Sequence, residues 1–366
     1  MKPKKNKKMP VVAVIMAGGY GERFWPKSRR RRPKQFLDIT GRGKSIIRET
    51  YERVRKFIPK DQIFVVTHTT QVSLVKQHIP ALPQNQILAE PMSRNTAPCV
   101  AWAAVECEKR FSDAVMLILP SDHIVINERV FEKDVVVACQ QALNSDGLVT
   151  FGIPPAYPET GYGYIERGKK VAPLTYQVRQ FTEKPGLKRA EKFIRSGKYY
   201  WNSGMFVFRA SVILDAVKRC DPKLYRAVKT MRQSRGKKVP VGIIQKVYRQ
   251  CEKKSLDYAV MEKYPHVYLV TARFRWSDIG SWSAVFDLVA KKPDQNVVLG
   301  KGQTVIMNSS GCLVSTDSDL VALCGVKDLV VIKEKDALLI CQKQSSQNVK
   351  NIVLRLNQKK SMKKFL

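Results

Sequence analysis

The sequence lacks the residue sets on which most covalent enzyme chemistry depends. Its eight cysteines form no CxxC pair and several lie in apolar runs, which is typical of reduced core thiols and suggests neither a zinc site nor a disulfide framework. Only four histidines are present, and the chain shows no Ser/His/Asp or Cys/His arrangement. We therefore expect a cytoplasmic protein without acyl-transfer or hydride-transfer chemistry.

Long apolar runs are also missing. No segment approaches the ~18 apolar residues that a membrane span requires. The lysine-rich start and the apolar run at residues 11–17 imitate a signal peptide, but the run is at the lower size limit and no small-x-small cleavage site follows it. We therefore expect no membrane partner.

Acidic residues are scarce relative to basic ones. The 366 residues include 65 Lys+Arg against 31 Asp+Glu, a formal charge of +34, while 44% hydrophobic content is enough for a sizeable core. Such an excess suggests polyanionic partners, nucleic acid being the obvious candidate. Only residues 2–8 and 29–32 are dense basic patches, however, and no zinc finger, RNA-recognition signature or basic heptad region is present. We favour anionic small substrates over nucleic acid.

A glycine-rich stretch near the start organises the chain. Residues 11–17 form an apolar run that is too short for a helix and β-branched enough for a buried parallel strand. Gly18, Gly19 and Gly21 follow directly and allow a sharp turn whose N–H groups approach an anion. Several cations come next, namely Arg23, Lys27, residues 29–32 and Lys34. This order is typical of a polyphosphate cradle.

The two standard phosphate motifs do not fit this stretch. The dinucleotide fingerprint requires a third glycine at position 24, where the chain has Phe24. A P-loop ending at residues 43–45 requires a glycine at position 38, where the chain has Asp38. The phosphate loop is therefore of another kind.

Strand and helix patterns alternate after this loop. Apolar spacing predicts helices at residues 45–58, 71–78 and 95–110 and buried strands at 63–67, 86–89 and 115–119. This alternation predicts an α/β fold, a Rossmann-like open mixed sheet with helices on both faces. In such a sheet ligands bind at the carboxyl ends of the strands.

Polar loops follow the predicted strands. In the loop at residues 90–98, Asn95 and Thr96 suit either a ligand site or a plain helix cap, and spacing alone does not choose between them. Asp122 follows another strand and is well placed to hold a divalent cation on phosphate oxygens. Asp278 is the second candidate metal ligand, since magnesium on a nucleotide tends to need two carboxylates.

The rest of the chain is less regular at first and then becomes rich in β-strands. Between about residues 148 and 275, polar groups lie beside glycine or aromatic residues, as where a sugar is held against a ring. Short strands at 304–307, 312–314, 320–323, 329–332 and 337–341 then suggest a small β-rich, β-solenoid-like domain, followed by a basic helix at about 347–356. We expect a basic tail at 1–10, a catalytic domain at 11–290 and a packing or oligomerisation domain at 291–366, with a homodimer as one assembly it would support.

Several motifs resemble those of the sugar-1-phosphate nucleotidyltransferases, and in particular of the mannose-1-phosphate guanylyltransferases. The resemblance rests on AGGYGERFWPKSRRRRPKQFL at residues 17–37 and on seven later motifs in the family order. These are RNTAP at 94–98, SDH at 121–123, TGYGYI at 160–165, FTEKP at 181–185, WNSGMF at 201–206, SLDYAVME at 255–262 and WSDIGSW at 276–282. The family's longer members add a cupin-type isomerase domain, for which this chain leaves no room, so only transferase activity is implied.

The resemblance also implies roles for single residues. It implies that the nucleotide is bound by Ala17, Gly18, Gly19, Gly21, Arg23, Glu90, Asn95, Thr96, Ala97 and Asp122. It implies that the sugar phosphate is bound by Gly161, Tyr162, Glu183, Lys184, Asn202 and Asp257, and that Mg²⁺ is bound by Asp122 and Asp278. The catalytic cations are Arg23, Lys34 and Lys184.

The activity implied is transfer of GMP from GTP to mannose 1-phosphate, giving GDP-mannose and pyrophosphate. The sugar phosphate arrives ionised and attacks in line, so no side-chain base is needed, and catalysis comes from bringing two anions together. The nearest alternative is a related transferase that uses glucose 1-phosphate with UTP or dTTP. A catalytically silent regulatory homologue is a further alternative, and the intact glycine loop argues against it.

Overall fold

The computed structural model describes residues 9–19 and 21–366. The chain divides into two compact units, and each is described by itself. The first comprises Met1–Gly18, Arg53–Pro120 and Val125–Trp276, and the second comprises Gly19–Glu52, Ser121–Ile124 and Ser277–Leu366. The basic tail predicted at residues 1–10 lies largely outside the described residues, and the predicted boundary after residue 290 stays a prediction.

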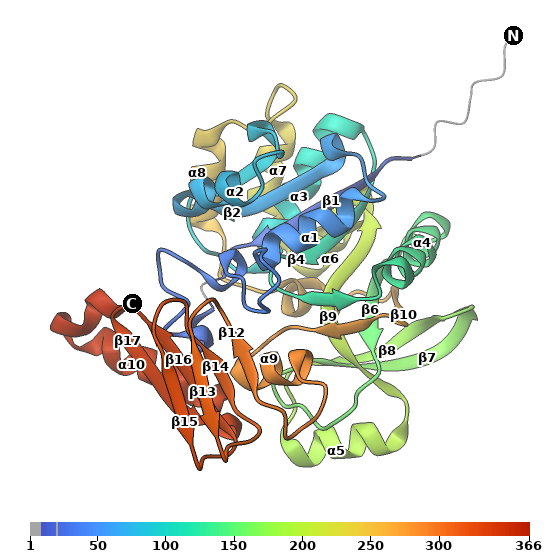
Figure 1. Ribbon diagram of the computed structural model, residues 1–366. Coiled ribbons are helices and arrows are strands. Elements are labelled where there is room, and N and C mark those ends of the chain that lie inside the picture. The colour runs from blue at the N-terminus through green and yellow to red at the C-terminus, as the bar shows by residue number, and fades with distance from the viewer. Residues whose placement is uncertain (1–8, 20) are drawn as a thin grey trace, which may run out of the picture. The chain divides into compact units, whose positions relative to one another are not determined.

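A nine-stranded mixed sheet forms the centre of the first unit (Figure 1). In sheet order its strands are β3 (Ile87–Glu90), β2 (Ile63–His68), β1 (Val11–Ala17), β4 (Val115–Pro120), β9 (Tyr199–Arg209), β6 (Leu148–Ile153), β10 (Val267–Thr271), β8 (Thr175–Thr182) and β7 (Tyr164–Ala172). The first four are parallel to one another, and β9 is antiparallel to both β4 and β6. The predicted open mixed sheet is thereby confirmed.

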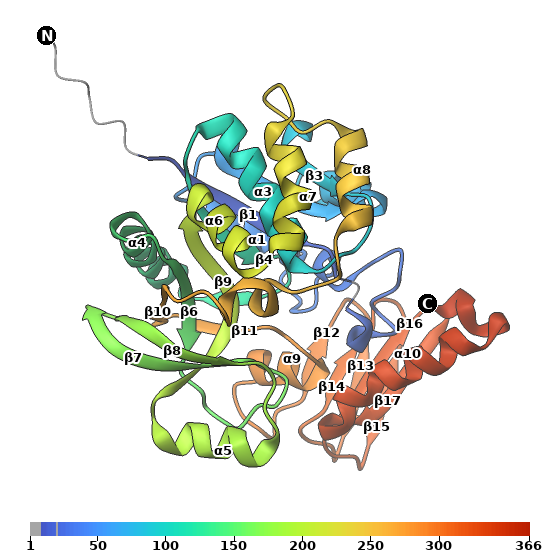
Figure 2. The same cartoon turned by 180° about the vertical axis from the view of Figure 1, so that it is seen from behind.

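Helices cover both faces of this sheet, which explains why its first strands are continuously apolar. Val12 and Val14 of β1 belong to one core with α3, α6, α7 and α8, the group that Figure 2 shows in front of the parallel strands. On α4, Phe131 packs against Phe151 of β6 with ring centroids 6.4 Å apart. The helices are α2 (Val72–His78), α3 (Thr96–Phe111), α4 (Glu128–Asn144), α5 (Leu187–Ser196), α6 (Ala210–Cys220), α7 (Pro222–Gln233) and α8 (Val241–Gln250).

The stretch at residues 148–275 is more regular than the sequence suggested. It holds five strands of the sheet and four helices, together with a π-helical turn, η6 (Asp257–Met261). The apolar signal is weak in several of these elements because they are half exposed, although β6 is buried throughout. Within α5 only Ala190 and Phe193 are buried, and the second half of β7 faces solvent. A register shift between Thr150 and Gly152 further breaks the alternation where β6 meets β9.

The second unit contains the small β-rich domain that the sequence predicted. Its strands are β12 (Val297–Leu299), β13 (Thr304–Met307), β14 (Leu313–Ser315), β15 (Val321–Cys324), β16 (Leu329–Glu334) and β17 (Ala337–Gln342). Val297 lies opposite Leu313 and Leu313 opposite Val330, all in parallel, so each coil stacks on the one before. β13 and β15 form a second, parallel ladder, and Cys312, Val314, Leu323 and Val331 form the core between them.

Helical segments complete the second unit. They are η1 (Glu22–Phe24), η2 (Lys34–Phe36), α9 (Trp282–Val289), η7 (Lys343–Asn348), α10 (Val349–Gln358) and η8 (Lys360–Phe365). α10 packs against η1, so the end of the chain lies on the segment that follows the glycines. The remaining elements are α1 (Ile46–Arg55), β5 (Ile124–Ile126) and β11 (Arg275–Ser277) and the short turns η3 (Lys60–Gln62), η4 (Thr69–Gln71) and η5 (Gln84–Gln86). Among the described helices, none is long and apolar enough to span a bilayer.

Candidate active site

The glycine loop has one position that only glycine can occupy. Gly21 has φ +67°, in the left-handed region that L side chains disfavour. A Cβ atom there would also lie 2.2 Å from the Cβ of Lys34. At Gly19, by contrast, a Cβ would meet no described atom within 4 Å. Gly21 therefore allows Lys34 to lie close against the loop, while Gly19 leaves space on its surface.

Side chains that follow the glycines hold the loop in place. The Gln35 amide donates from Nε2 to the carbonyl of Gly19 at 2.9 Å, and the Ser28 hydroxyl donates to the carbonyl of Gly21 at 2.7 Å. Gln35 is almost completely buried, so its hydrogen bond is protected from water. The residues after the glycines thus fix the backbone that the sequence assigned to phosphate.

A cleft of about 410 Å³ opens in the second unit beside this loop. We call it the cationic cleft. It is lined by Gly21, Glu22, Arg23, Phe24, Lys34, Asp122, His123, Asp278, Ile279, Gly280 and Lys350. Arg23, Lys34, Asp122 and Asp278, which the sequence predicted as site residues, therefore share one cleft. His123, Gly280 and Lys350 were not among the predicted site residues.

Lys34 joins the two candidate metal ligands. Its Nζ donates to Asp122 Oδ2 at 3.0 Å and to the backbone carbonyl of Asp278 at 2.5 Å, although the lysine itself is only 5% exposed. Burial raises the pKa of Asp122, but Lys34 and then His123 outweigh it, and the pKa lies below its ordinary value. His123 Nε2 lies 3.7 Å from Asp122 Oδ1, so the imidazole lies beside the carboxylate that Lys34 also contacts.

The backbone next to Asp278 is strained. Ile279 is completely buried and has φ +42°, which a β-branched residue rarely adopts. A Cβ at Gly280 would lie 3.3 Å from one carboxylate oxygen of Asp278, so the glycine leaves room for that carboxylate. Such outliers concentrate at functional sites, where the surrounding structure maintains them.

The donor set of the cationic cleft suits magnesium. Asp122 and Asp278 offer hard carboxylate oxygens, which Mg²⁺ prefers. No group of three or more His, Cys, Asp or Glu side chains that would cage an ion occurs in the described part of the chain. Mg²⁺ is usually bound through one or two carboxylates plus substrate phosphates and water, so two aspartates beside a phosphate loop fit it.

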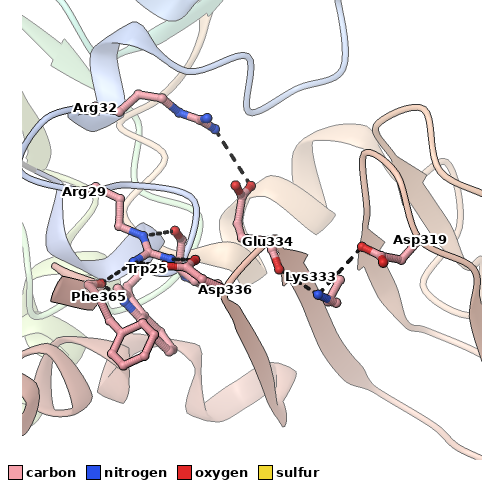
Figure 3. Close-up of polar contacts among 9 residues, drawn as sticks. Trp25, Arg29, Arg32, Asp319, Lys333, Glu334, Asp336 and Phe365 are labelled. Carbon is pink, nitrogen blue, oxygen red and sulfur yellow. Dashed lines mark hydrogen bonds and ion pairs between the residues drawn. The ribbon is translucent and has the colours of Figure 1, made fainter. Parts of the chain in front are cut away.

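Most of the other basic residues near the loop contact the β-rich domain or the helical segments that follow it instead of lining the cleft, and Figure 3 shows these contacts for Arg29 and Arg32. Arg29 pairs with Asp336 at 2.7 Å and also donates to the carbonyl of Phe365. The other contacts are Lys27 to Ser315 at 3.0 Å, Arg30 to Asn357 at 2.7 Å and Arg32 to Glu334 at 3.8 Å. Of the cations that follow the glycines, Lys27, Arg29, Arg30 and Arg32 therefore have partners elsewhere in the second unit, whereas Arg23 and Lys34 line the cleft.

Three of the predicted nucleotide residues of the first unit, Ala17, Gly18 and Glu90, lie at the end of β1. Ala17, the last residue of β1, accepts a hydrogen bond from the Thr67 hydroxyl at 2.8 Å. A Cβ at Gly18 would lie 3.7 Å from Glu90 Oε2. Tyr248 donates to the other oxygen of Glu90 at 2.9 Å. Burial raises the pKa of Glu90 to about 7, with the Tyr248 hydrogen bond opposing it.

Asn95, Thr96 and Ala97 begin α3, and their polar groups have partners within the protein. Asn95 is the N-cap of α3 and accepts from the Thr96 amide at 2.8 Å, so the helix-cap interpretation is confirmed. Its backbone has φ +65°, which asparagine tolerates better than most residues. The Thr96 hydroxyl accepts from the Leu256 amide at 2.8 Å, and Ala97 is completely buried. A ligand role for these three stays a prediction.

Four of the predicted sugar residues, Glu183, Lys184, Asn202 and Asp257, lie close together in the first unit. We call Gly163, Glu183, Lys184, Asn202 and Asp257 the Asn202 cluster. Asn202 donates from Nδ2 to Asp257 Oδ1 at 2.8 Å, and its Oδ1 accepts from the Gly204 amide at 3.1 Å. Burial and then the charge of Glu183 raise the pKa of Asp257. Lys184 pairs with Glu183, is exposed, and has φ +43°.

Of the glycines in the TGYGYI motif, Gly163 rather than Gly161 belongs to the Asn202 cluster. A Cβ at Gly163 would lie 2.5 Å from Glu183 Oε2, and the backbone N–H of Asn202 donates to the backbone carbonyl of Gly163 at 2.8 Å. Gly161 instead donates its amide to Glu159 at 2.7 Å. Tyr162 lies edge-on to Trp201 and Trp276, with centroids 5.3 Å and 5.4 Å away. No local pattern favours Gly163 over Gly161, because the contacts of Gly163 are with Glu183 and Asn202, which are distant in the chain.

Comparison with known proteins agrees with this geometry. Residues 12–295 match the family model described as nucleotidyl transferase. Residues 302–356 match the model described as MannoseP isomerase/GMP-like beta-helix domain. The first match spans the nine-stranded sheet apart from Val11, and the second spans β13 to β17 and most of α10.

Similar proteins are known in bacteria. The mannose-1-phosphate guanylyltransferases of Klebsiella pneumoniae and Escherichia coli are each 39% identical over 362 residues, or 97% of this chain and 76% of the relative. A crystal structure described as mannose-1-phosphate geranyltransferase from Thermus thermophilus is 33% identical and superposes with a TM-score of 0.88 over 95% of this chain and 100% of that one. The chain belongs to the nucleotidyl transferase family and, within it, to the mannose-1-phosphate guanylyltransferases.

Proposed function

We propose that the protein transfers GMP from GTP to α-D-mannose 1-phosphate, producing GDP-mannose and pyrophosphate. The observation that carries this proposal is the Lys34 ammonium, which bridges Asp122 and Asp278 in a cleft that also contains Arg23. Cations and carboxylates held together in this way suit a substrate with several phosphates. The related guanylyltransferases support the choice of GTP and mannose 1-phosphate.

The chemistry requires no base on the protein. A phosphate oxygen of mannose 1-phosphate attacks the α-phosphorus of GTP, the bond between the α-phosphorus and its bridging oxygen breaks, and pyrophosphate leaves with the electron pair. In this proposal Arg23 and Lys34 stabilise the charge on the triphosphate. Mg²⁺, held by Asp122 and Asp278, would neutralise phosphate oxygens when bound.

The Asn202 cluster supplies recognition of the sugar in this proposal. Glu183 and Asn202 provide hydrogen-bonding groups for the hydroxyls of mannose, and Lys184 provides the charge for its phosphate. The rings of Tyr162 and Trp201 supply apolar surface beside these polar groups. We also propose a reducing, cytoplasmic location, since all eight cysteines are free thiols. The homodimer stays a prediction.

The test is pyrophosphate release with Mg²⁺, crossing GTP, ATP, UTP, dTTP and CTP against mannose 1-phosphate and glucose 1-phosphate. Release with GTP and mannose 1-phosphate alone is the expected result. Release with another pair would retain the reaction class and overturn the substrates. No release from folded protein across all pairs would contradict the proposal, and steeply salt-dependent binding to nucleic acid would then favour that alternative.

A further inference from the structure

Lys350 is a cation of the cationic cleft that comes from α10, far along the chain from the other lining residues. It is exposed, and in the described part of the chain it makes no hydrogen bond or ion pair. Arg23 is likewise exposed and unpaired among the described residues. Lys34, in contrast, is buried and bound to Asp122 and Asp278. The cleft therefore has two available cations in addition to Lys34.

The placement of Lys350 is fixed by a dense set of contacts. α10 packs against η1, which carries Arg23, and Val349, next to Lys350, is almost completely buried. Arg30 donates to Asn357 on the same helix at 2.7 Å. Beyond the helix, Trp25 donates from Nε1 to the carbonyl of Phe365 at 2.9 Å, a contact that Figure 3 shows together with that of Arg29. The basic run thus anchors the segment that brings Lys350 to the cleft.

We propose that Lys350 binds the part of the triphosphate that leaves as pyrophosphate. This inference rests on the proposed function. Lys34 is held by Asp122 and by the backbone carbonyl of Asp278, the candidate metal ligands beside which the transferred phosphoryl group is expected. Lys350 and Arg23 come from the packed pair α10 and η1, so they are the cations left for the β- and γ-phosphates. Their charges oppose the negative charge that builds up on the leaving group.

The test is calorimetric binding of GTP, GMP and inorganic pyrophosphate, with Mg²⁺, to the full chain and to Lys350→Ala. Affinity for GTP and for pyrophosphate should fall by about tenfold, as for loss of one charge-assisted contact, while affinity for GMP stays unchanged. Lys350→Arg should retain most of the affinity because it keeps the charge. The matched control is Arg355→Ala, an exposed cation on α10 that does not line the cleft.

Three outcomes would overturn the proposal: unchanged affinity for pyrophosphate in Lys350→Ala, an equal loss in Arg355→Ala, or an equal loss for GMP. Circular dichroism and the melting temperature establish that each variant is folded. The binding measurement with pyrophosphate does not require turnover or guanine specificity. If the wild-type protein fails the transfer test but binds pyrophosphate through Lys350, the failure lies in the proposed function and not in this assignment.

Discussion

The cationic cleft and the Asn202 cluster shift the pKa of a carboxylate in opposite directions, downward for Asp122 and upward for Asp257. In the cleft, Lys34 lies against Asp122 and lowers its pKa, so the carboxylate stays ionised beside a cation. In the Asn202 cluster, burial and Glu183 raise the pKa of Asp257, and its hydrogen-bond partner is the neutral amide of Asn202. The cleft is suited to polyanions and metal, whereas the cluster offers hydrogen-bonding groups for hydroxyls and one cation, Lys184, for a phosphate. Loss of a candidate metal ligand in the cleft should therefore affect turnover, whereas loss of Lys184 in the cluster should affect the affinity for one substrate.

The largest effect is expected from Asp122→Asn and Asp278→Asn. Loss of a metal ligand removes several kcal/mol of charge stabilisation, so kcat should fall about 10²- to 10⁴-fold. Steady-state kinetics across a Mg²⁺ titration measure this, and more Mg²⁺ should recover part of the loss. The melting temperature should stay near that of the wild type, because Lys34 retains the carbonyl of Asp278 as a partner in Asp122→Asn.

Asp319→Asn is the matched control for this experiment. Asp319 also faces a lysine, Lys333 at 3.7 Å, but it lies in the β-rich domain and does not line the cleft. Its removal should leave kcat unchanged. Near-normal turnover at ordinary Mg²⁺ in either Asp122→Asn or Asp278→Asn would remove that residue from the metal site.

The second-largest effect is expected from Gly21→Ala, which we compare with Gly19→Ala. Gly21→Ala places a Cβ 2.2 Å from Lys34 in a left-handed backbone, so it should destabilise the fold by at least ~1–2 kcal/mol and displace Lys34. The added Cβ of Gly19→Ala meets no atom of the described residues within 4 Å, so this variant should fold normally and weaken GTP binding only by crowding the phosphates. Thermal denaturation and calorimetric titration with GTP distinguish the two. Unchanged GTP affinity in folded Gly19→Ala would exclude that glycine from the phosphate loop.

A smaller and more selective effect is expected in the Asn202 cluster. Lys184→Ala should raise KM for mannose 1-phosphate by about tenfold or more, as for loss of a charge-assisted hydrogen bond, and leave KM for GTP unchanged. Initial rates with each substrate varied in turn measure this. Lys188→Ala is the control, because Lys188 is an exposed lysine on the neighbouring helix α5. A change confined to GTP would show that Lys184 was assigned to the wrong substrate.

Buried elements of the fold were easier to predict from the sequence than partly exposed ones. The strand at residues 11–17 has the predicted limits because both faces are covered and its apolar run is unbroken. The half-exposed elements among residues 148–275, such as α5 and β7, showed no such run, so their regularity was missed. The same limit applies to the candidate site. The local sequence was enough to predict Gly21 and Asp122 as site residues. The positions of Lys350 and Gly163, by contrast, depend on packing between segments that are distant in the chain. The ion pair of Arg29 was also not predictable from the local sequence, because its partner Asp336 lies 307 residues later.

The smallest effect is expected from Glu90→Gln. The Glu90 carboxylate is buried beside Gly18 and belongs to neither the cationic cleft nor the Asn202 cluster. Its pKa of about 7 in the folded protein exceeds the ordinary 4.5. The folded state therefore keeps a proton that the unfolded chain releases, and stability falls as pH rises from about 4.5 through 7. Glu90→Gln removes this titration while its amide oxygen can still accept from Tyr248. Relative to wild type, the variant should gain roughly 2–3 kcal/mol between pH 4 and pH 8.5.

Denaturant unfolding of both proteins at several pH values gives this difference directly, since all other titrations cancel. Tyr248→Phe sharpens the result. It deletes the hydrogen bond that opposes the rise in the pKa of Glu90, so the midpoint of the pH effect should move upward. A pH-independent difference between Glu90→Gln and wild type would mean that Glu90 is ionised throughout this range. In that case a cation or a bound ligand, and not burial, would govern the charge next to the glycine loop.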